Sequence, residues 1–223
     1  MHGIVLIHGL GTLDAALDLA TELGDVIEPG FAMTPSLHDG KVYSIEVRNS
    51  GRGVVDEFGH IILSTTNRPF ELHTDGYNRR PSPHFVVLLR SDTSNDHPLT
   101  HLADTRQTIQ RLDASTIMSL AEERFPCAHG LQSVLSAVGH QYVVRLNREE
   151  ISRWSDKLGN VEGGMSAEHR LALDAFASEL ASDQAALSMT RGDCLVLDNT
   201  RVCHGRSALA RDSERTLKRI WIV

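Results

Sequence analysis

Runs of apolar, β-branched residues lie at both ends of this chain and in its middle, and their order limits the folds that it can adopt. The runs at 3–10, 84–91 and 217–223 predict buried strands, and the run at 193–205 predicts another. Helical patterns lie between these runs but do not alternate with them one by one, as a doubly wound parallel sheet requires. The order therefore favours a mainly β fold with helices, in which an antiparallel sandwich or jelly roll is decorated by α-helices.

The remaining periodic segments fill the chain between these runs. Further strands are predicted at 41–49, where apolar and polar residues alternate, at 59–67 and 70–75, which Pro69 interrupts, and at 141–147. Apolar residues at helical spacing predict helices at 12–24, 101–112, 115–125 and 166–182. Thr12 and Ser166 are expected to cap two of these helices, because a hydroxyl can accept a hydrogen bond from a free backbone N–H group of the first turn.

Length and composition predict one globular domain that spans residues 1–223. Hydrophobic residues make up 41% of the chain and charged residues 23%, which is typical of a globular protein. The net charge is −7 and no run of Lys or Arg exceeds two residues, so nucleic acid and membrane are poor candidates as partners. Three cysteines without metal-type spacing, and a first segment without a signal-peptide pattern, predict a cytoplasmic location.

The segment VLIHGLG (5–11) offers one functional interpretation. A strand that ends in His-Gly-x-Gly resembles the oxyanion loop of α/β hydrolases, which would make the protein an esterase. That fold also presents its nucleophile on a Gly-x-Ser-x-Gly turn, and GMSAE (164–168) is the nearest segment, without the second glycine. The esterase is kept as an alternative, and a strand that leads through a glycine turn into a helix is the plainer interpretation.

The segment FELHTDGYN (70–78) places a histidine and an aspartate two residues apart in a pattern that alternates like a strand. Residues i and i+2 of a strand project to the same face, so His73 and Asp75 can point at one spot. Together with a further histidine they would form a facial triad, which leaves positions open on non-heme Fe(II). Two polar residues of an ordinary surface turn are the alternative.

The segment RGDCLVLDNTRVCHGRSA (191–208) supplies a candidate for the third ligand. A Gly-Asp turn precedes an apolar strand, and His204 follows it. Arg215 and Arg219 come 11 and 15 residues after His204 (215 − 204 and 219 − 204), and a guanidinium can hold a carboxylate by two parallel hydrogen bonds. The sequence thus predicts a carboxylate-binding site beside the metal, with surface salt bridges as the alternative for both arginines.

Four motifs occur in a family-specific order: HTDG, HPLTHLAD (97–104), GDCLVLDNTRVCHGR and RTLKR. In this order they resemble the taurine dioxygenase-like (TauD/TfdA) superfamily on its clavaminate-synthase-like side. The resemblance runs from about residue 59 to the C-terminus and includes the opening strand and helix. It implies an Fe(II)/2-oxoglutarate-dependent dioxygenase on a double-stranded β-helix, with Fe(II), 2-oxoglutarate and O2 as cofactor and co-substrates.

Carried over residue by residue, the resemblance assigns roles to six positions. It implies three metal ligands, which are also the catalytic residues: His73, Asp75 and His204. It implies that Thr100 and Arg215 bind the distal carboxylate of 2-oxoglutarate, and that Arg219 lies near its other carboxylate or near an acidic group of the substrate. For Thr100, a helix N-cap at the start of 101–112 is the alternative.

The implied reaction is hydroxylation of an unactivated C–H bond of a small polar substrate, with desaturation or ring closure as variants. Asp75 speaks against halogenation, since related halogenases carry Gly or Ala at that position. The expected substrate is an amino acid or an amino-acid-derived natural product, and a sulfonate or another small organic acid comes second. The residues expected to contact it are Glu71, Tyr77, Asn78 and Arg219. A non-catalytic member of the fold that only binds a small molecule is a further alternative.

Two departures from the family pattern bear on the pocket. Relatives usually have Gly-Gly before the threonine, and here the pair is His97-Pro98, which changes the expected shape of the loop that precedes Thr100. The chain is also shorter than most members, so we expect a trimmed lid or N-terminal segment. The pocket is then either more open than usual or completed by a second subunit in a homo-oligomer.

Overall fold

The structure is a computed structural model that describes residues 3–28, 38–48, 51–56, 58–93, 98–158, 164–210 and 213–223. His97 lies outside these ranges, so the expected effect of the His97-Pro98 pair on its loop remains a prediction.

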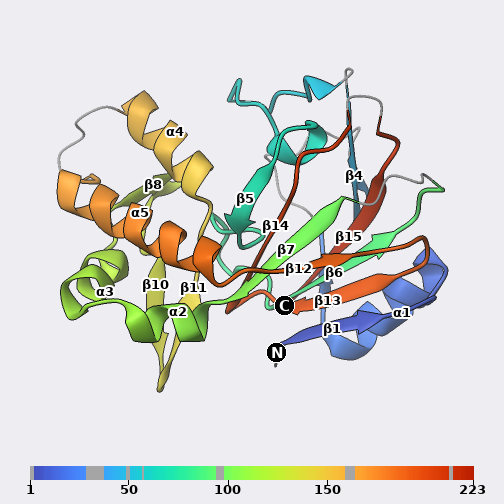
Figure 1. Cartoon of the computed structure of the whole chain (residues 1–223), viewed down its shortest axis with the longest axis horizontal. Helices are drawn as coiled ribbons and strands as arrows, with labels where there is room; N and C mark the ends of the chain where they lie inside the picture. The colour runs from blue at the N-terminus through green and yellow to red at the C-terminus, as the bar shows by residue number, and fades with distance from the viewer. Residues whose placement is uncertain are drawn as a thin grey trace.

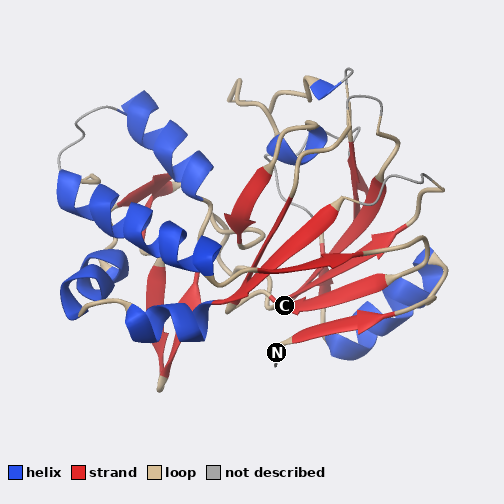
Figure 2. Ribbon diagram, viewed as in Figure 1, coloured by secondary structure: helices blue, strands red, loops and turns tan. Residues whose placement is uncertain are grey.

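Two antiparallel sheets form the centre of the molecule (Figure 1, Figure 2). The larger has the strand order β1-β13-β6-β15-β4-β3, with β2 also paired to β15, and the smaller has the order β12-β7-β14-β5. The strands of the larger sheet are β1 (Ile4–Ile7), β2 (Val26–Ile27), β3 (His38–Asp39), β4 (Val42–Glu46), β6 (Phe85–Arg90), β13 (Cys194–Asp198) and β15 (Thr216–Ile222). Those of the smaller sheet are β5 (Phe70–His73), β7 (Leu99–Asp104), β12 (Ala185–Ser188) and β14 (Val202–Arg206).

One apolar cluster joins the two sheets. Val86 and Leu88 of β6 meet Leu102 of β7 and Val202 of β14 in it. Because side chains alternate along a strand, the residues between them face the other way. Burial of this cluster therefore holds the smaller sheet against one face of the larger, and the segments that carry the candidate ligands lie in and beside the smaller sheet.

Helix α1 (Leu13–Leu23) covers the other face of the larger sheet. The Thr12 hydroxyl accepts a hydrogen bond from the backbone N–H of Ala15 at 3.2 Å, which confirms Thr12 as the N-cap. Ala16 and Ala20 are fully buried and pack in a cluster that includes Val87 of β6. Small residues on this helix face let the helix approach the sheet closely.

A helical layer lies at the opposite side of the molecule (Figure 1). It contains α2 (Thr105–Arg111), α3 (Ala114–Ala121), α4 (Arg148–Leu158), α5 (Ala167–Ser182) and the hairpins β8 (Phe125–Cys127)–β9 (Gly130–Gln132) and β10 (Leu135–Val138)–β11 (Gln141–Val144). Phe176 and Leu173 of α5 are buried in its core, which also includes Ala103 and Cys203 of the smaller sheet. Ser166 caps α5 as predicted.

Three sequence predictions were wrong in detail. The segment 101–112 is not one helix, because Leu99–Asp104 pairs with strands on both sides and α2 begins only at Thr105. The segment 59–75 is regular only at β5, and its first part contains a 3-10 turn, η3 (Leu63–Thr65). Helix α4 was missed, because REEISRWSDKL buries only Ile151 and Trp154 and otherwise looks like a solvated segment.

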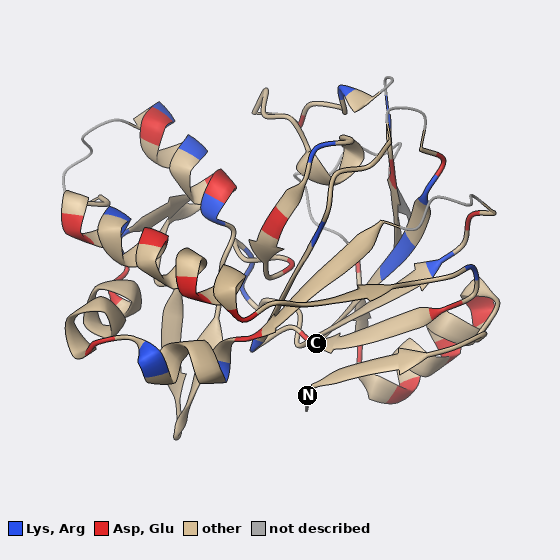
Figure 3. Ribbon diagram, viewed as in Figure 1, with Lys and Arg blue, Asp and Glu red and all other residues tan. Residues whose placement is uncertain are grey.

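Charges are interleaved on the ribbon (Figure 3). Lys and Arg alternate with Asp and Glu along α4, and no basic stripe crosses the described part of the molecule. Among the described residues, no helix combines the length and the apolar character that crossing a bilayer requires.

Candidate active site

The turn after β5 positions the first two candidate ligands. His73 is the last residue of β5 and Asp75 follows in the turn, and their exposed fractions are only 4% and 3%. Asn199, between β13 and β14, fixes this turn. Its Oδ1 accepts a hydrogen bond from the Asp75 backbone N–H at 2.8 Å, and its Nδ2 donates to the carbonyl oxygens of Asp75 (3.0 Å) and Pro83 (2.8 Å).

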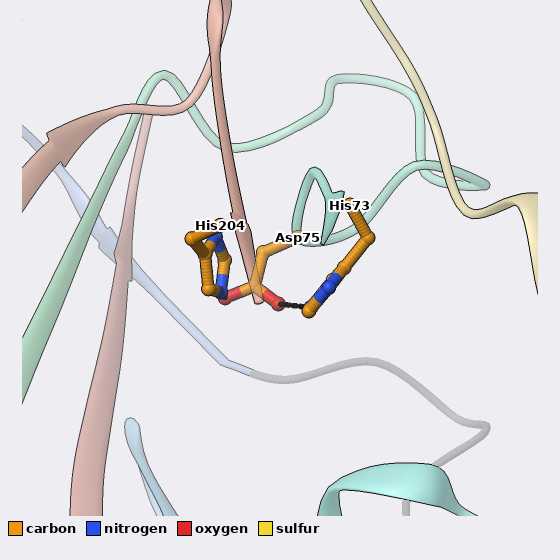
Figure 4. Close-up of side chains that lie close together, drawn as sticks. All are labelled: His73, Asp75 and His204. Atoms are coloured by element: carbon orange, nitrogen blue, oxygen red, sulfur yellow. Dashed lines mark ion pairs between the residues drawn. The ribbon is translucent and has the colours of Figure 1, made fainter. Parts of the chain in front are cut away.

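Strand pairing brings in the third candidate ligand. Strand β14 pairs antiparallel with β5 and places His204 directly opposite His73, with ring centroids 4.4 Å apart. Figure 4 shows the two imidazoles on either side of the Asp75 carboxylate. One ligand atom from each of His73, Asp75 and His204 lies within 4.8 Å of the other two. Residues 131 positions apart in the chain (204 − 73) thus converge on one buried point, as a facial triad requires.

A bulge in β5 explains why Glu71 does not share this point. His204 pairs with His73 and Arg206 pairs with Phe70, so two steps on β14 oppose three steps on β5. The extra residue reverses the alternation before His73. Phe70 therefore stacks on the His73 ring at 3.9 Å, while the half-exposed Glu71 side chain forms an ion pair with Arg148. Glu71 lines a separate groove beside α5 and neither of the two cavities at His73, so the expectation that it contacts the substrate there, which followed from its position two residues before His73 on a regular strand, is wrong in this geometry.

The protonation states fit metal ligation. Burial, with a contribution from His204, lowers the pKa of His73 to about 3, and burial also lowers the pKa of His204. Both imidazoles are therefore neutral at neutral pH and can offer a lone pair to a metal. The Nδ1 of His73 lies 2.8 Å from the Glu71 carbonyl oxygen, to which it can only donate. This bond leaves the lone pair on Nε2, which lies 3.8 Å from Asp75.

Two side chains of β15 hold the Asp75 carboxylate. Arg219 donates to its Oδ1 at 2.6 Å and the indole N–H of Trp221 donates to its Oδ2 at 3.0 Å. Burial alone would raise the pKa of Asp75, but the Arg219 guanidinium is the strongest opposing influence, the hydrogen bond from Trp221 adds to it, and the pKa is lowered. The carboxylate is thus charged, and each oxygen retains a lone pair, so the donor set of two neutral imidazoles and one carboxylate suits Fe(II).

A first cavity lies beside this point and is lined by Thr100, Arg215, Arg219 and both candidate histidine ligands; we call it the Thr100 cavity. Thr100 lies within β7, and Asp104 caps α2, so the N-cap alternative for Thr100 is wrong. The Arg215 guanidinium and the Thr100 hydroxyl are 3.5 Å apart, and both residues are buried. A cation and a hydroxyl donor side by side can hold one carboxylate.

A second cavity also reaches His73 and is lined by Asp75 as well. It is lined by Tyr77 and Asn78, as predicted from the sequence, and by Arg219; we call it the Tyr77 cavity. Its wall also includes residues that were not predicted: Asp56, Phe58, Asn147, Glu150, Trp154 and Trp221. The three from α4 and its start follow helical spacing, 147, 150 and 154. Asn147 with a Glu three residues later is an N-terminal helix signal that could have revealed them.

Glu150 and Tyr77 stand out within the Tyr77 cavity. Burial, reinforced by Asp56 and Glu149 against the opposing effect of Arg153, raises the pKa of Glu150 to about 7. Burial also raises the pKa of Tyr77, and the negative charge of Glu150 raises it further. The two side chains therefore interact electrostatically. The Tyr77 hydroxyl is buried and has no hydrogen-bond partner among the described residues.

The esterase alternative is not favoured. The exposed Ser166 hydroxyl lies 2.6 Å from Nδ1 of His169, whose Nε2 lies 3.2 Å from Glu122, which is a Ser-His-Glu line. These contacts form the capping box of α5, because the Ser166 oxygen also accepts from the backbone N–H of His169. Ser166 lines neither cavity nor the groove beside α5.

Residues 130–221 match the model of the family described as "Taurine catabolism dioxygenase TauD, TfdA family". This range contains His204, Arg215 and Arg219, and the match confirms the resemblance for the two motifs that lie in it, GDCLVLDNTRVCHGR and RTLKR. The comparison with curated protein sequences gave no match.

Solved structures confirm the fold. The asparagine oxygenase AsnO is 18% identical, with a TM-score of 0.71 over 99% of this chain and 73% of that protein. The same enzyme in complex with Fe(II), 2S,3S-3-hydroxyasparagine and succinate is 17% identical, with a TM-score of 0.72 over 99% and 74%. The non-heme iron oxygenase OrfP, in complex with Fe, succinate and (3R,4R)-dihydroxy-L-Arg, is 17% identical, with a TM-score of 0.71 over 100% and 76%. The chain therefore has the same fold as these two oxygenases.

Proposed function

We propose that the protein is an Fe(II)- and 2-oxoglutarate-dependent oxygenase that hydroxylates an unactivated C–H bond of an amino acid or an amino-acid-derived molecule. The observation that carries the proposal is the convergence of His73, Asp75 and His204 on one buried point. The Thr100 cavity and the Tyr77 cavity both reach this point, which adds support, because such an enzyme must bind a co-substrate and a substrate next to one metal.

The chain's own residues would hold, orient and shield the reactants. Fe(II), when bound, would supply the oxidising chemistry together with 2-oxoglutarate and O2. His73, Asp75 and His204 would occupy one face of the ion and leave the other open. Arg215 and Thr100 would fix the distal carboxylate of 2-oxoglutarate. Arg219 lines both cavities, so it can orient Asp75 and also hold a second carboxylate.

The reaction and substrate class draw support from the structural relatives. Their complexes contain succinate with a hydroxylated asparagine or a hydroxylated arginine. Hydroxylation of an amino acid is therefore proposed ahead of desaturation, ring closure or oxidation of a sulfonate. We further propose that the two sheets form a double-stranded β-helix, or jelly roll, within one oxygenase domain. The three buried free cysteines support a reducing, cytoplasmic location.

Succinate release from 2-oxoglutarate tests the proposal. The purified protein is incubated with Fe(II), 2-oxoglutarate and a panel of amino acids in air, and succinate and hydroxylated product are quantified. We expect succinate that depends on Fe(II) and on at least one amino acid, and almost none from the His73→Ala variant. Equal succinate from that variant would refute the metal assignment.

A second measurement separates a catalytic from a merely binding protein. Under anaerobic conditions, Fe(II) and 2-oxoglutarate together are expected to produce a weak visible absorption band with the wild-type protein and none with His73→Ala. Absence of this band from the folded wild-type protein would favour the non-catalytic alternative.

A further inference from the structure

One part of the Tyr77 cavity wall is acidic and incompletely paired. The carboxylates that line the cavity are Asp56, Asp75 and Glu150, and the guanidinium that lines it is Arg219. Arg219 donates to Asp75 at 2.6 Å, so its charge is directed at that carboxylate. Asp56 Oδ1 accepts hydrogen bonds from the backbone N–H groups of Phe58 and His60, which carry no net charge. Asp56 and the ionised form of Glu150 therefore leave this part of the wall with an excess of negative charge.

Contacts outside the cavity do not fully neutralise Glu150. Arg153 donates to its Oε1 at 2.9 Å, but the second nitrogen of the same guanidinium donates to Glu149 at 2.7 Å. Oε2 lies 3.9 Å from a ring nitrogen of His60, beyond hydrogen-bonding distance. The Glu150 side chain is only 19% exposed, so water compensates it poorly.

Tyr77 gives a second, independent sign that a ligand belongs here. Its hydroxyl is buried without a hydrogen-bond partner among the described residues, and Tyr77 is 6% exposed. Buried polar groups in folded proteins are almost always paired, so an unpaired hydroxyl in a cavity wall indicates a missing partner. The rings of Phe58 and Trp154 also line the cavity, and the Lys157 ammonium lies 5.8 Å and 5.0 Å from their centroids, so these rings already contact one cation.

We propose that Glu150, with Asp56 and Tyr77, binds a positively charged nitrogen group of the substrate. This inference rests on the proposed function and sharpens it: the substrate carries an ammonium or guanidinium group, held at the α4 side of the Tyr77 cavity. A sulfonate or a simple dicarboxylic acid would place negative charge against these carboxylates and is disfavoured. The cation is either the α-ammonium of an amino acid or a side-chain group, and the two sources can be separated.

Paired probes test the proposal by calorimetry on the protein loaded with Fe(II) and 2-oxoglutarate under anaerobic conditions. L-Arginine is compared with L-citrulline, which replaces the guanidinium by a neutral urea, and L-norleucine with 2-hydroxyhexanoate, which replaces the α-ammonium by a hydroxyl. We expect the cationic member of at least one pair to bind with a Kd roughly tenfold lower or more. The pair that shows the preference identifies the source of the cation.

Three variants assign the preference to its residues. Glu150→Gln is expected to abolish the preference for the cation, and Tyr77→Phe to weaken binding of the cationic probe several-fold. Glu149→Gln is the matched control, because Glu149 is the neighbouring carboxylate on α4, also pairs with Arg153, and does not line the cavity. This control should retain the preference. Equal binding of both members of each pair would overturn the proposal, and so would equal losses in the Glu149 and Glu150 variants.

Failure of this inference and failure of the proposed function give different results. If the anaerobic absorption band forms but no probe pair shows a charge preference, only the inference falls. If the band does not form while a Glu150-dependent preference persists, the cation site stands and the oxygenase assignment falls. Thermal unfolding of each variant checks that a lost preference does not come from a lost fold.

Discussion

The two cavities that meet at His73 are built from different parts of the fold. The wall of the Thr100 cavity comes largely from strands: Leu88 of β6, Thr100 of β7, His204 of β14, and Leu217 and Arg219 of β15. The wall of the Tyr77 cavity comes largely from the segment 56–64, the turn 74–78 and helix α4. The sheets thus fix one cavity, and segments at their edge shape the other.

The difference matches what each cavity is proposed to bind. Thr100 pairs with Arg206 of β14 on one side and Leu187 of β12 on the other, so its position is set by two strand registers. The position of Glu150, by contrast, depends on how helix α4 packs. A co-substrate common to many enzymes suits the rigid part, whereas a substrate that differs between enzymes suits segments that can change without disturbing the sheets.

The largest effect is expected when a proposed metal ligand is removed, because the co-substrate and the substrate both depend on the metal. His204→Ala leaves two of the three proposed ligands, so we expect bound iron to be lost and succinate formation to fall by about a hundredfold or more. Iron content and succinate release check this. His101→Ala is the control, because His101 lies on β7 opposite Gly205 and lines the groove beside α5. Similar losses in both variants would contradict the assignment of His204.

Arg215→Gln should weaken binding in the Thr100 cavity and leave binding in the Tyr77 cavity unchanged. The loss of a charged hydrogen-bond donor to 2-oxoglutarate should raise the KM for 2-oxoglutarate by roughly 10- to 100-fold, with little change in the Kd of the amino-acid substrate. Asn78→Ala, on the Tyr77 cavity, should show the opposite split with a change of a few-fold. If each variant shifted both constants alike, the division between the cavities would be wrong.

The sequence predicted residues of both cavities, and those that it missed line the Tyr77 cavity. His73, Asp75, His204, Thr100 and Arg215, whose roles the family resemblance implied, each line one or both of the two cavities. Arg219 was left between two roles, and the structure explains why: it lines both cavities.

The misses arise where tertiary contacts decide the local structure. Glu71 was placed on the wrong face, because the bulge opposite His204 and Arg206 depends on pairing that periodicity does not reveal. The first part of 59–75 is not a strand, since the buried Arg206 guanidinium donates to the carbonyl oxygens of Leu63 and Thr66 and holds that segment in a turn. Glu150 was missed because α4 has a sparse apolar pattern.

Asn199→Ala tests how far the metal turn depends on its brace. The amide makes three hydrogen bonds to the backbone of Asp75 and Pro83, and their removal leaves buried backbone groups unpaired. We expect a loss of about 1–3 kcal/mol in the free energy of unfolding, together with weaker iron binding. Urea unfolding measures the first and iron titration the second. Asn78→Ala, at a half-buried residue of the same region, should change the free energy of unfolding by about 0.5 kcal/mol or less.

Glu150→Gln is expected to change the free energy of unfolding only slightly, but it distinguishes most clearly between a role of this carboxylate in binding and a role in stability. The pKa of Glu150 in the folded protein is about 7, above its ordinary value of 4.5, so the folded state binds the proton more tightly than the unfolded state. Its contribution to stability is present below pH 4.5 and is lost as the pH rises through 7. The charged groups that set this pKa are Arg153, Asp56 and Glu149. Glutamine cannot ionise, so we expect the variant to gain about 1–2 kcal/mol relative to wild type at pH 8, and less at pH 5.

Urea unfolding of the apoprotein at both pH values checks this gain, with Glu149→Gln measured beside it. Glu149 also pairs with Arg153 but does not line the cavity, so its variant should be neutral or slightly destabilised at both pH values. A variant at 150 that is destabilised at pH 8 would mean that the pair with Arg153 stabilises the fold. Stabilisation at pH 8 together with a lost preference for cationic probes would mean that the carboxylate is kept at a cost to stability, because the substrate, and not the fold, needs its charge.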